Sequence, residues 1–290
     1  SNRFNYYGGS NGNTNWFEEF YRDFTSSQEH SLNVSGGNEK VNFYTSGGFM
    51  DQNGLNRYAD DNLQRYNLNN KINVKISDKL EFMSNTRFVR EDYDKPTHMN
   101  ALFYHNIARR WPTVPLYDNI GNYAEPSEVS QLLDGGRTKT QEDALSQQLQ
   151  LTFRPLANWN IVGNANYNIE NINTHMEVLK AYAYDADNNG YLIPVSDNAA
   201  GYTGVSGFNA KNEYFSTNFF TDYSLQLNEN HQFKFLVGFN SERTKTRTLS
   251  GSRSDLITDN IPTLNTATNN PNTSGGFQHW ATAGFFGRVN

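Results

Sequence analysis

The clearest fold signal in the sequence is the stretch HSLNVSGGNEKVNFYTSGGFMD (His30–Asp51), in which a glycine turn joins two alternating segments. Before the turn, Leu32 and Val34 alternate with polar residues. After it, one parity holds Val41, Phe43, Thr45, Gly47 and Phe49. Glycine tolerates the positive φ of a tight reversal, and alternation of period two is typical of a strand with one apolar face. The stretch therefore predicts an antiparallel β-hairpin.

The same unit of two alternating segments and a short turn returns three times, and a further segment begins another. The segments are Gln64–Lys75 with Lys79–Glu91, Leu145–Phe153 with Asn158–Ile169, Phe215–Leu227 with His231–Glu242, and finally Phe277–Asn290. Most run about 10–13 residues, whereas strands of soluble proteins commonly have about 5–6 and a tilted membrane strand needs roughly 9–11. These lengths favour strands that cross a membrane.

The connections between the segments fall into two classes. Those after Gly36, Ile76, Phe153 and Leu227 are short. The others, over residues 52–62, 92–143, 170–213 and 243–276, are long and polar. Short turns on one rim and long loops on the other are typical of outer-membrane barrels, whose long loops are extracellular.

The composition is both polar and aromatic. Phe, Tyr and Trp make up 14% of the 290 residues, yet only 36% are hydrophobic and the mean hydropathy is −0.77. Disordered chains are poor in aromatic residues, so a sheet with one wet face is the better interpretation. The sequence has no cysteine, which is compatible with the cell envelope. A net charge of −6 argues against a nucleic-acid partner.

Together these patterns predict an all-β fold, part of a large antiparallel transmembrane β-barrel with long extracellular loops and short periplasmic turns. The alternative is a soluble or surface β-rich glycan-binding or adhesion module. A barrel would turn the apolar parity toward lipid, whereas a sandwich would bury it against a second sheet. The residues that distinguish the two are Val41, Phe43, Phe82, Leu151, Phe219, Phe235 and Phe239.

Several blocks of residues resemble the SusC/RagA family, in the family's order. The opening hairpin, from His30-Ser31-Leu32-Asn33-Val34 to Asp51-Gln52-Asn53-Gly54, and the preceding Asn15-Trp16-Phe17-Glu18-Glu19 carry the most specific resemblance. Arg110–Asp118 with Gly121-Asn122-Tyr123 resembles a large loop of that family. Gly284–Asn290 resembles a later strand start.

The resemblance implies a TonB-dependent nutrient importer of the Bacteroidetes outer membrane, carrying oligosaccharide or peptide. Its implied partners are a SusD-like surface lipoprotein, TonB acting through a plug region missing here, and outer-membrane lipid. No signal peptide is visible at Ser1 and the strand pattern runs to Asn290, so we expect an internal piece of a longer protein. Residues 1–29 would lead in from the plug or first barrel strand, and 30–290 would form about nine barrel strands. Residues 16–24 are a weak candidate for an earlier strand.

Catalytic and metal-binding signatures are missing from the sequence. The six histidines have no spacing typical of a zinc site, and no phosphate-binding glycine loop opens a helix. We therefore predict no enzyme and no cofactor. Asp185-Ala186-Asp187-Asn188-Asn189-Gly190 matches half of a calcium loop, but Ser196 stands where the closing Glu is needed, which favours an Asn-Gly turn.

Aromatic residues of the long loops are the candidate contacts for substrate or for a lid protein, since an aromatic face offers apolar area with a polar tip. The alternative is that they only pack the loops together. They are Tyr104, Trp111, Tyr117, Tyr123, Tyr182, Tyr184, Tyr191 and Tyr202. Between Met99 and Arg110 the spacing of apolar residues predicts a short helix that braces its loop.

Overall fold

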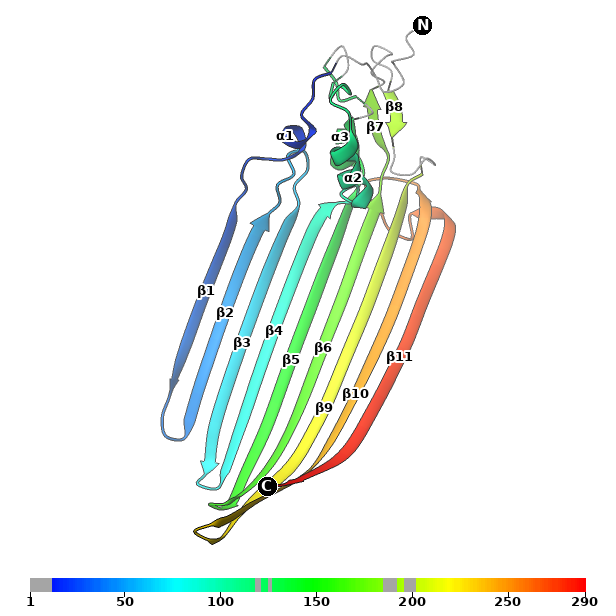
Figure 1. Cartoon of the computed structure of the whole chain (residues 1–290). Helices are drawn as coiled ribbons and strands as arrows, with labels where there is room; N and C mark the ends of the chain where they lie inside the picture. The colour runs from blue at the N-terminus through cyan, green and yellow to red at the C-terminus, as the bar shows by residue number, and fades with distance from the viewer. Residues whose placement is uncertain (1–11, 118–120, 125–126, 185–191, 196–201) are drawn as a thin grey trace.

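A nine-stranded antiparallel sheet dominates the structure, a computed structural model that describes residues 12–117, 121–124, 127–184, 192–195 and 202–290 (Figure 1). Its strands are β1 (Ser27–Gly37), β2 (Val41–Asn53), β3 (Asn62–Ser77), β4 (Leu80–Pro96), β5 (Arg137–Leu156), β6 (Trp159–Val178), β9 (Gly204–Asn228), β10 (His231–Leu256) and β11 (Ala267–Val289). The loops carry α1 (Trp16–Phe20), α2 (Ala101–Arg109), α3 (Val129–Asp134) and the hairpin β7 (Ala181–Tyr184) with β8 (Leu192–Val195).

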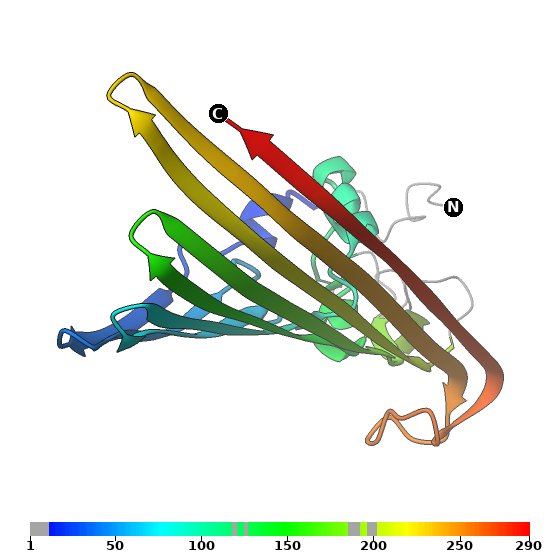
Figure 2. The same cartoon turned by 90° about the horizontal axis from the view of Figure 1, so that it is seen from below.

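The strands of the large sheet follow one another in chain order, so each is paired with its neighbours in sequence except where the β7–β8 hairpin intervenes. Figure 2 shows that the sheet is bent and twisted, with its first and last strands at an angle to one another. β1 and β11 are its edges. The helices and the small hairpin all lie at the end where the long loops are, opposite the short turns (Figure 1).

Successive hairpins are staggered. Val41, the first residue of β2, pairs with Val74, while Leu80 of β4 pairs with Phe153 and Trp159 of β6 pairs with Tyr223. Each turn therefore extends a few residues beyond the preceding one. A constant stagger of this kind is what tilts the strands of a barrel relative to its axis.

The predicted hairpins are confirmed, and the strands extend well past their predicted ends on the loop side. β5 begins at Arg137 rather than Leu145, β9 at Gly204 rather than Phe215, and β10 continues to Leu256. Much of these extensions is polar on both faces of the strand, as in Arg243–Thr248, so the alternation that marks a strand disappears although the ladder of hydrogen bonds continues.

Two expectations for the loops can be compared with the structure. The weak strand candidate at residues 16–24 is wrong, because Trp16–Phe20 forms α1 and buries Trp16 and Phe20 on one side. The predicted helix between Met99 and Arg110 is confirmed as α2, whose N-terminus is capped by the side chain of Asn100. No helix in the described part of the chain is long and apolar enough to cross a membrane.

Candidate functional site

The large sheet has two chemically different faces, and the apolar one is defined by a row of in-register residues across six strands. The row consists of Phe82, Leu151, Gly163, Phe219, Phe239 and Phe285. Leu151 is 46% exposed and Phe219 56% exposed, and none of the distinguishing residues named above is buried. A soluble sandwich would bury these side chains, so the structure contradicts the alternative of a sandwich that packs this face against a second sheet.

Aromatic residues border the apolar face both at the end near the turns and at the end near the loops. Near the turns, the Trp159 ring packs edge-on against Tyr223 and its Nε1 donates to Thr221 Oγ1 at 2.7 Å. Toward the loops, Phe49 packs against Tyr66 with 5.1 Å between ring centroids. Two aromatic girdles around an apolar band of about 25 Å are the mark of a transmembrane barrel.

Polar side chains within the apolar face bond to one another across the strands. Asn70 Nδ2 donates to Thr45 Oγ1 at 2.7 Å. Gln147 accepts from Thr86 Oγ1 at 2.5 Å and donates to Ser84 Oγ at 3.1 Å. Because lipid offers no hydrogen-bond partner, a polar group there is tolerated only when the protein satisfies it. These pairs fit a face turned toward hydrocarbon.

The opposite face, called here the amide face, carries a ladder of uncharged amides. Gln150, Asn164, Asn218 and Asn240 are in register on β5, β6, β9 and β10. Asn240 Nδ2 donates to Asn218 Oδ1 at 2.5 Å, and Asn218 Nδ2 donates to Asn164 Oδ1 at 3.2 Å. Such a wall offers both donors and acceptors without a net charge.

Farther toward the loops, the amide face becomes charged and forms a pocket of ≈ 570 Å³. Arg65 pairs with Glu91 at 3.3 Å, and Asn212 donates to Glu170 at 2.7 Å. The lining also includes Arg87, Glu142 and Tyr214. The described residues hold no group of three or more His, Asp or Glu side chains that could bind a metal ion.

A compact cluster of buried side chains, called here the loop platform, lies at the loop end of the sheet. It is formed by α1, α2 with the preceding Met99, α3, and the segment that joins α2 to α3. Its buried residues are Trp16, Phe20, Met99, Phe103, Ile107, Val114, Leu116, Val129 and Leu132. The Phe20 ring meets the edges of Phe103 and Tyr58 at 5.2 and 5.7 Å. Burial, with the nearby Glu19 carboxylate, raises the pKa of Tyr58.

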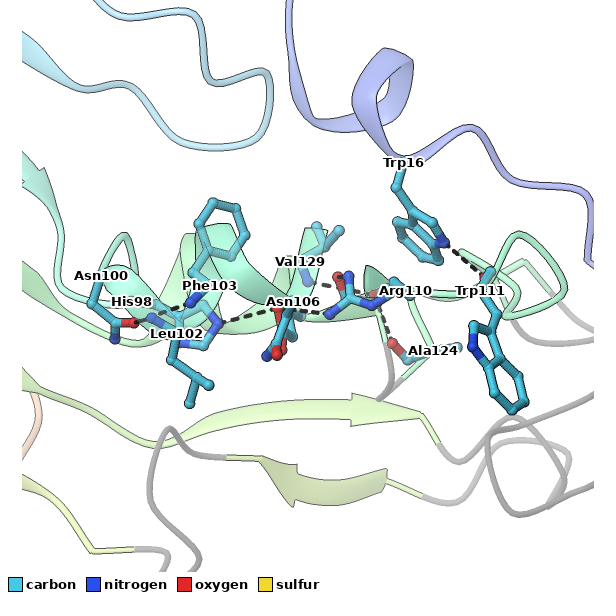
Figure 3. A network of polar contacts seen from close by, with 12 residues as sticks. Trp16, His98, Asn100, Leu102, Phe103, Asn106, Arg110, Trp111, Ala124 and Val129 are labelled. Carbon is cyan, nitrogen blue, oxygen red and sulfur yellow. Dashed lines mark hydrogen bonds and ion pairs between the residues drawn. The ribbon is translucent and has the colours of Figure 1, made fainter. Parts of the chain in front are cut away.

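A buried ion pair ties the platform together (Figure 3). Arg110, whose side chain is 8% exposed, binds Glu128 at 2.7 Å, and Asn106 Nδ2 donates to Glu128 Oε1 at 2.6 Å. His98 Nε2 lies 3.6 Å from Glu128 Oε2. Burial alone would raise the pKa of Glu128, but His98 and Arg110 outweigh it and hold that pKa below its ordinary value.

The same arginine connects the platform to the segment before β1. The Arg110 guanidinium lies 4.6 Å from the Trp16 ring centroid, and Trp16 Nε1 donates to the carbonyl of Trp111 at 3.1 Å. Sequence reasoning missed this arrangement. Its partners come from three separate parts of the chain, so no spacing in the sequence brings them together. In the structure Glu128 adopts a positive φ of 62° just before α3.

The candidate aromatics that the structure describes belong to the segments at the loop end, but they do not form one cluster. Tyr117 stacks on Tyr123 at 5.2 Å, and the backbone N–H of Tyr184 on β7 donates to the carbonyl of Tyr123. Trp111 is 68% exposed, and Tyr104, Tyr117, Tyr182 and Tyr202 are also exposed. Tyr191 and the calcium-like fragment at residues 185–190 lie outside the described residues.

Comparison with known proteins identifies the class. No family model matches the sequence. A TonB-dependent receptor, P26 of Formosa agariphila, is 23% identical over 274 residues, which cover 89% of this chain and 26% of that protein. The RagAB peptide importer matches in its closed-closed state with a TM-score of 0.76 and 14% identity, over 97% of this chain and 31% of the other. Its open-open state gives 0.76 and 14%, over 95% and 30%.

The fold is therefore that of an outer-membrane β-barrel of the TonB-dependent receptor class. More narrowly, the fold is similar to part of the RagA barrel, and the chain spans about a quarter to a third of the length of the proteins it matches. On this fold the apolar face corresponds to the outer side of the barrel wall and the amide face to its inner side.

Proposed function

We propose that the chain is a section of the barrel wall of an outer-membrane importer that takes up oligosaccharide or peptide with energy supplied through TonB. The observation that carries this proposal is the two-faced sheet, apolar outside and amide-lined inside, on a fold shared with a peptide importer. An uncharged wall of amides suits cargo that is rich in hydrogen-bonding groups, such as sugar hydroxyls or peptide bonds.

The division of the chain follows from the same proposal. Residues 1–29 lead in from a plug or an earlier strand, and residues 30–290 supply the first part of the barrel. The edges β1 and β11 each present a strand with one unpaired side. Because lipid does not tolerate open sheet edges, further strands of the longer protein must pair with them.

A SusD-like lipoprotein over the loops is the proposed partner. The exposed aromatics Trp111, Tyr117 and Tyr182 offer apolar area on the α2–α3 segment and on β7. These elements lie away from the turns (Figure 1). The loop platform at the same end has a buried core, which would limit the entropy lost when a lid binds. These side chains are the proposed contacts for lid or cargo.

The test is purification of the full-length protein from outer membranes in detergent, with any lipoprotein that accompanies it. We expect a detergent-requiring complex that binds oligosaccharide or peptide. Replacing Trp111 and Tyr182 by Ala should weaken binding of the lipoprotein or of cargo about tenfold or more, as loss of interface aromatics commonly does. Replacing the half-buried Tyr58 by Phe serves as a control for folding. A folded protein that is monodisperse in water without detergent would refute the importer.

A further inference from the structure

The outer face changes character abruptly along β10. Its outward positions are first apolar, at Phe233, Phe235, Val237 and Phe239, and then, after Ser241, cationic at Arg243, Lys245 and Arg247. Side chains two residues apart on a strand point to the same face, so all seven share the lipid-facing side. Residues 243–276 were predicted as a long connection, in which the alternation of these cations would not assign them to one face.

The height of these cations follows from strand geometry. A strand rises about 3.3 Å per residue, and at a tilt of about 40° each residue gains roughly 2.5 Å along the barrel axis. An apolar band about 25 Å tall therefore takes about ten residues. Counted from Phe233, that band ends at Arg243. The three cations begin where the hydrocarbon of the outer leaflet ends and headgroups start.

Neighbouring strands offer these three charges a single acid, Glu213 of β9, which is in register with Lys245. Lys211 of β9 is in register with Arg247 and adds a fourth outward cation. The nearest acid, Glu213, is bound by Lys211 at 3.0 Å and accepts from Tyr167 Oη at 3.1 Å. In the part of the chain that the structure describes, neither Arg243, Lys245 nor Arg247 has an ion-pair partner within 4.0 Å.

The cross-strand row that contains Arg247 continues to β4 and β5, where its arginine is paired with an acid. Arg90 is in the same cross-strand row as Arg247, and it is held by Asp143 through two bonds of 2.6 and 2.7 Å. The charge there is neutralised within the protein. On β10 the cations have no ion pair of this kind among the described residues, although the whole chain is acidic, with a net charge of −6. The Arg247 guanidinium lies 5.8 Å from the Phe277 ring, which supports it from β11.

We propose that Arg243, Lys245 and Arg247, with Lys211 beside them, bind the phosphorylated headgroup of a lipid in the outer leaflet. Arginine presents paired N–H donors that match phosphate oxygens, and a lipid whose chains lie on Phe235 and Phe239 brings its phosphates to this height. The inference rests on the proposed membrane orientation and adds a specific anionic lipid site to it.

The experiment is native mass spectrometry of the full-length protein in a neutral detergent, titrated with bis-phosphorylated lipid A or with the same lipid after its phosphates are removed. The test variant carries R243Q, K245Q and R247Q. The control variant carries K40Q, K71Q and K79Q, which removes the same charge from exposed lysines near the turns and on the inner face. We expect the test variant to bind the phosphorylated lipid about tenfold more weakly or worse, and the control to bind as the parent does.

Three results would overturn the proposal. They are equal binding of the dephosphorylated lipid, equal loss in the control variant, or displacement by millimolar inorganic phosphate alone, which would indicate a site for free phosphate. Import of cargo by the folded test variant separates this inference from the importer itself. If both variants need detergent and still import, a failure to bind lipid A refutes only the lipid site.

Discussion

The sheet and the loop platform use apolar side chains in opposite ways. On the sheet, large side chains such as Leu151 and Phe219 remain exposed, and the strands are held by their backbone ladders. In the platform, Phe20 and Phe103 are completely buried around a paired arginine and glutamate. The exposed apolar side chains of the sheet suit a lipid environment, and the buried core of the platform suits an aqueous one, because only water drives apolar groups into a core. Substitutions that act on one region should leave the other intact.

The largest effect is expected in the platform. Replacing Phe103 by Ala removes the ring that packs against Phe20, and we expect it to destabilise the platform by about 3–5 kcal/mol. Limited proteolysis of the full-length protein should then cut the loops while the barrel keeps its heat-modifiable mobility on gels. Leu102→Ala, at an exposed neighbouring position of α2, is the matched control. Loss of the barrel together with the platform would contradict the independence of the two regions.

The next effect belongs to the apolar band. An arginine in place of Phe219 would lie in the hydrocarbon, at an expected cost of about 2–4 kcal/mol in the free energy of unfolding in lipid. The matched control is Leu249→Arg, because Leu249 is on the same face and 62% exposed, but above the band. Reversible unfolding in urea from lipid vesicles measures both. Equal effects of the two substitutions would mean that the band is misplaced.

The buried ion pair should make the platform sensitive to acid. The pKa of Glu128 is lower in the folded protein than in the unfolded chain, so its contribution is present above its ordinary pKa of 4.5 and disappears as the pH falls through the lower folded value. Glu128→Gln should cost about 2–3 kcal/mol at neutral pH and remove much of the increase in loop proteolysis below about pH 4. Glu39→Gln, in an exposed turn, should retain that increase.

The smallest effect is expected on the inner wall. Asn218→Ala breaks the bonds to Asn164 and Asn240, with an expected loss of about 1 kcal/mol because water in the lumen can replace part of them. Thr217→Ala, on the other face at the next residue, should change the thermal unfolding temperature less. An effect as large as that of Phe219→Arg would show that the wall is dry rather than wet.

The sequence predicted the parts of the fold in which one face differs from the other. Alternation gave the hairpins and the outward positions of Val41, Phe82 and Phe235, because lipid requires apolar side chains on every second residue. It failed where both faces are polar, so the loop-side ends of β9 and β10 were assigned to loops. The weak strand candidate at residues 16–24 had poor alternation, and Trp16–Phe20 instead forms a helix that buries Trp16 and Phe20.

The candidate site was harder to predict than the fold. Loop aromatics were identified by residue type, and those that the structure describes lie at the loop end without joining into one surface. The pairing of Arg110 with Glu128 depends on a long irregular loop, in which spacing carries no information about contact. No local pattern in a single sequence distinguishes that arginine from Arg109, which is beside it and exposed.

The hydrogen bond from Trp16 to the carbonyl of Trp111 joins residues 95 positions apart, with strands β1–β4 between them. Closing so long a segment costs entropy unless those strands are already aligned. The contact should therefore form late in folding, after the hairpins β1–β2 and β3–β4 have paired. The fluorescence of Trp16 would then report when this part of the sheet is complete.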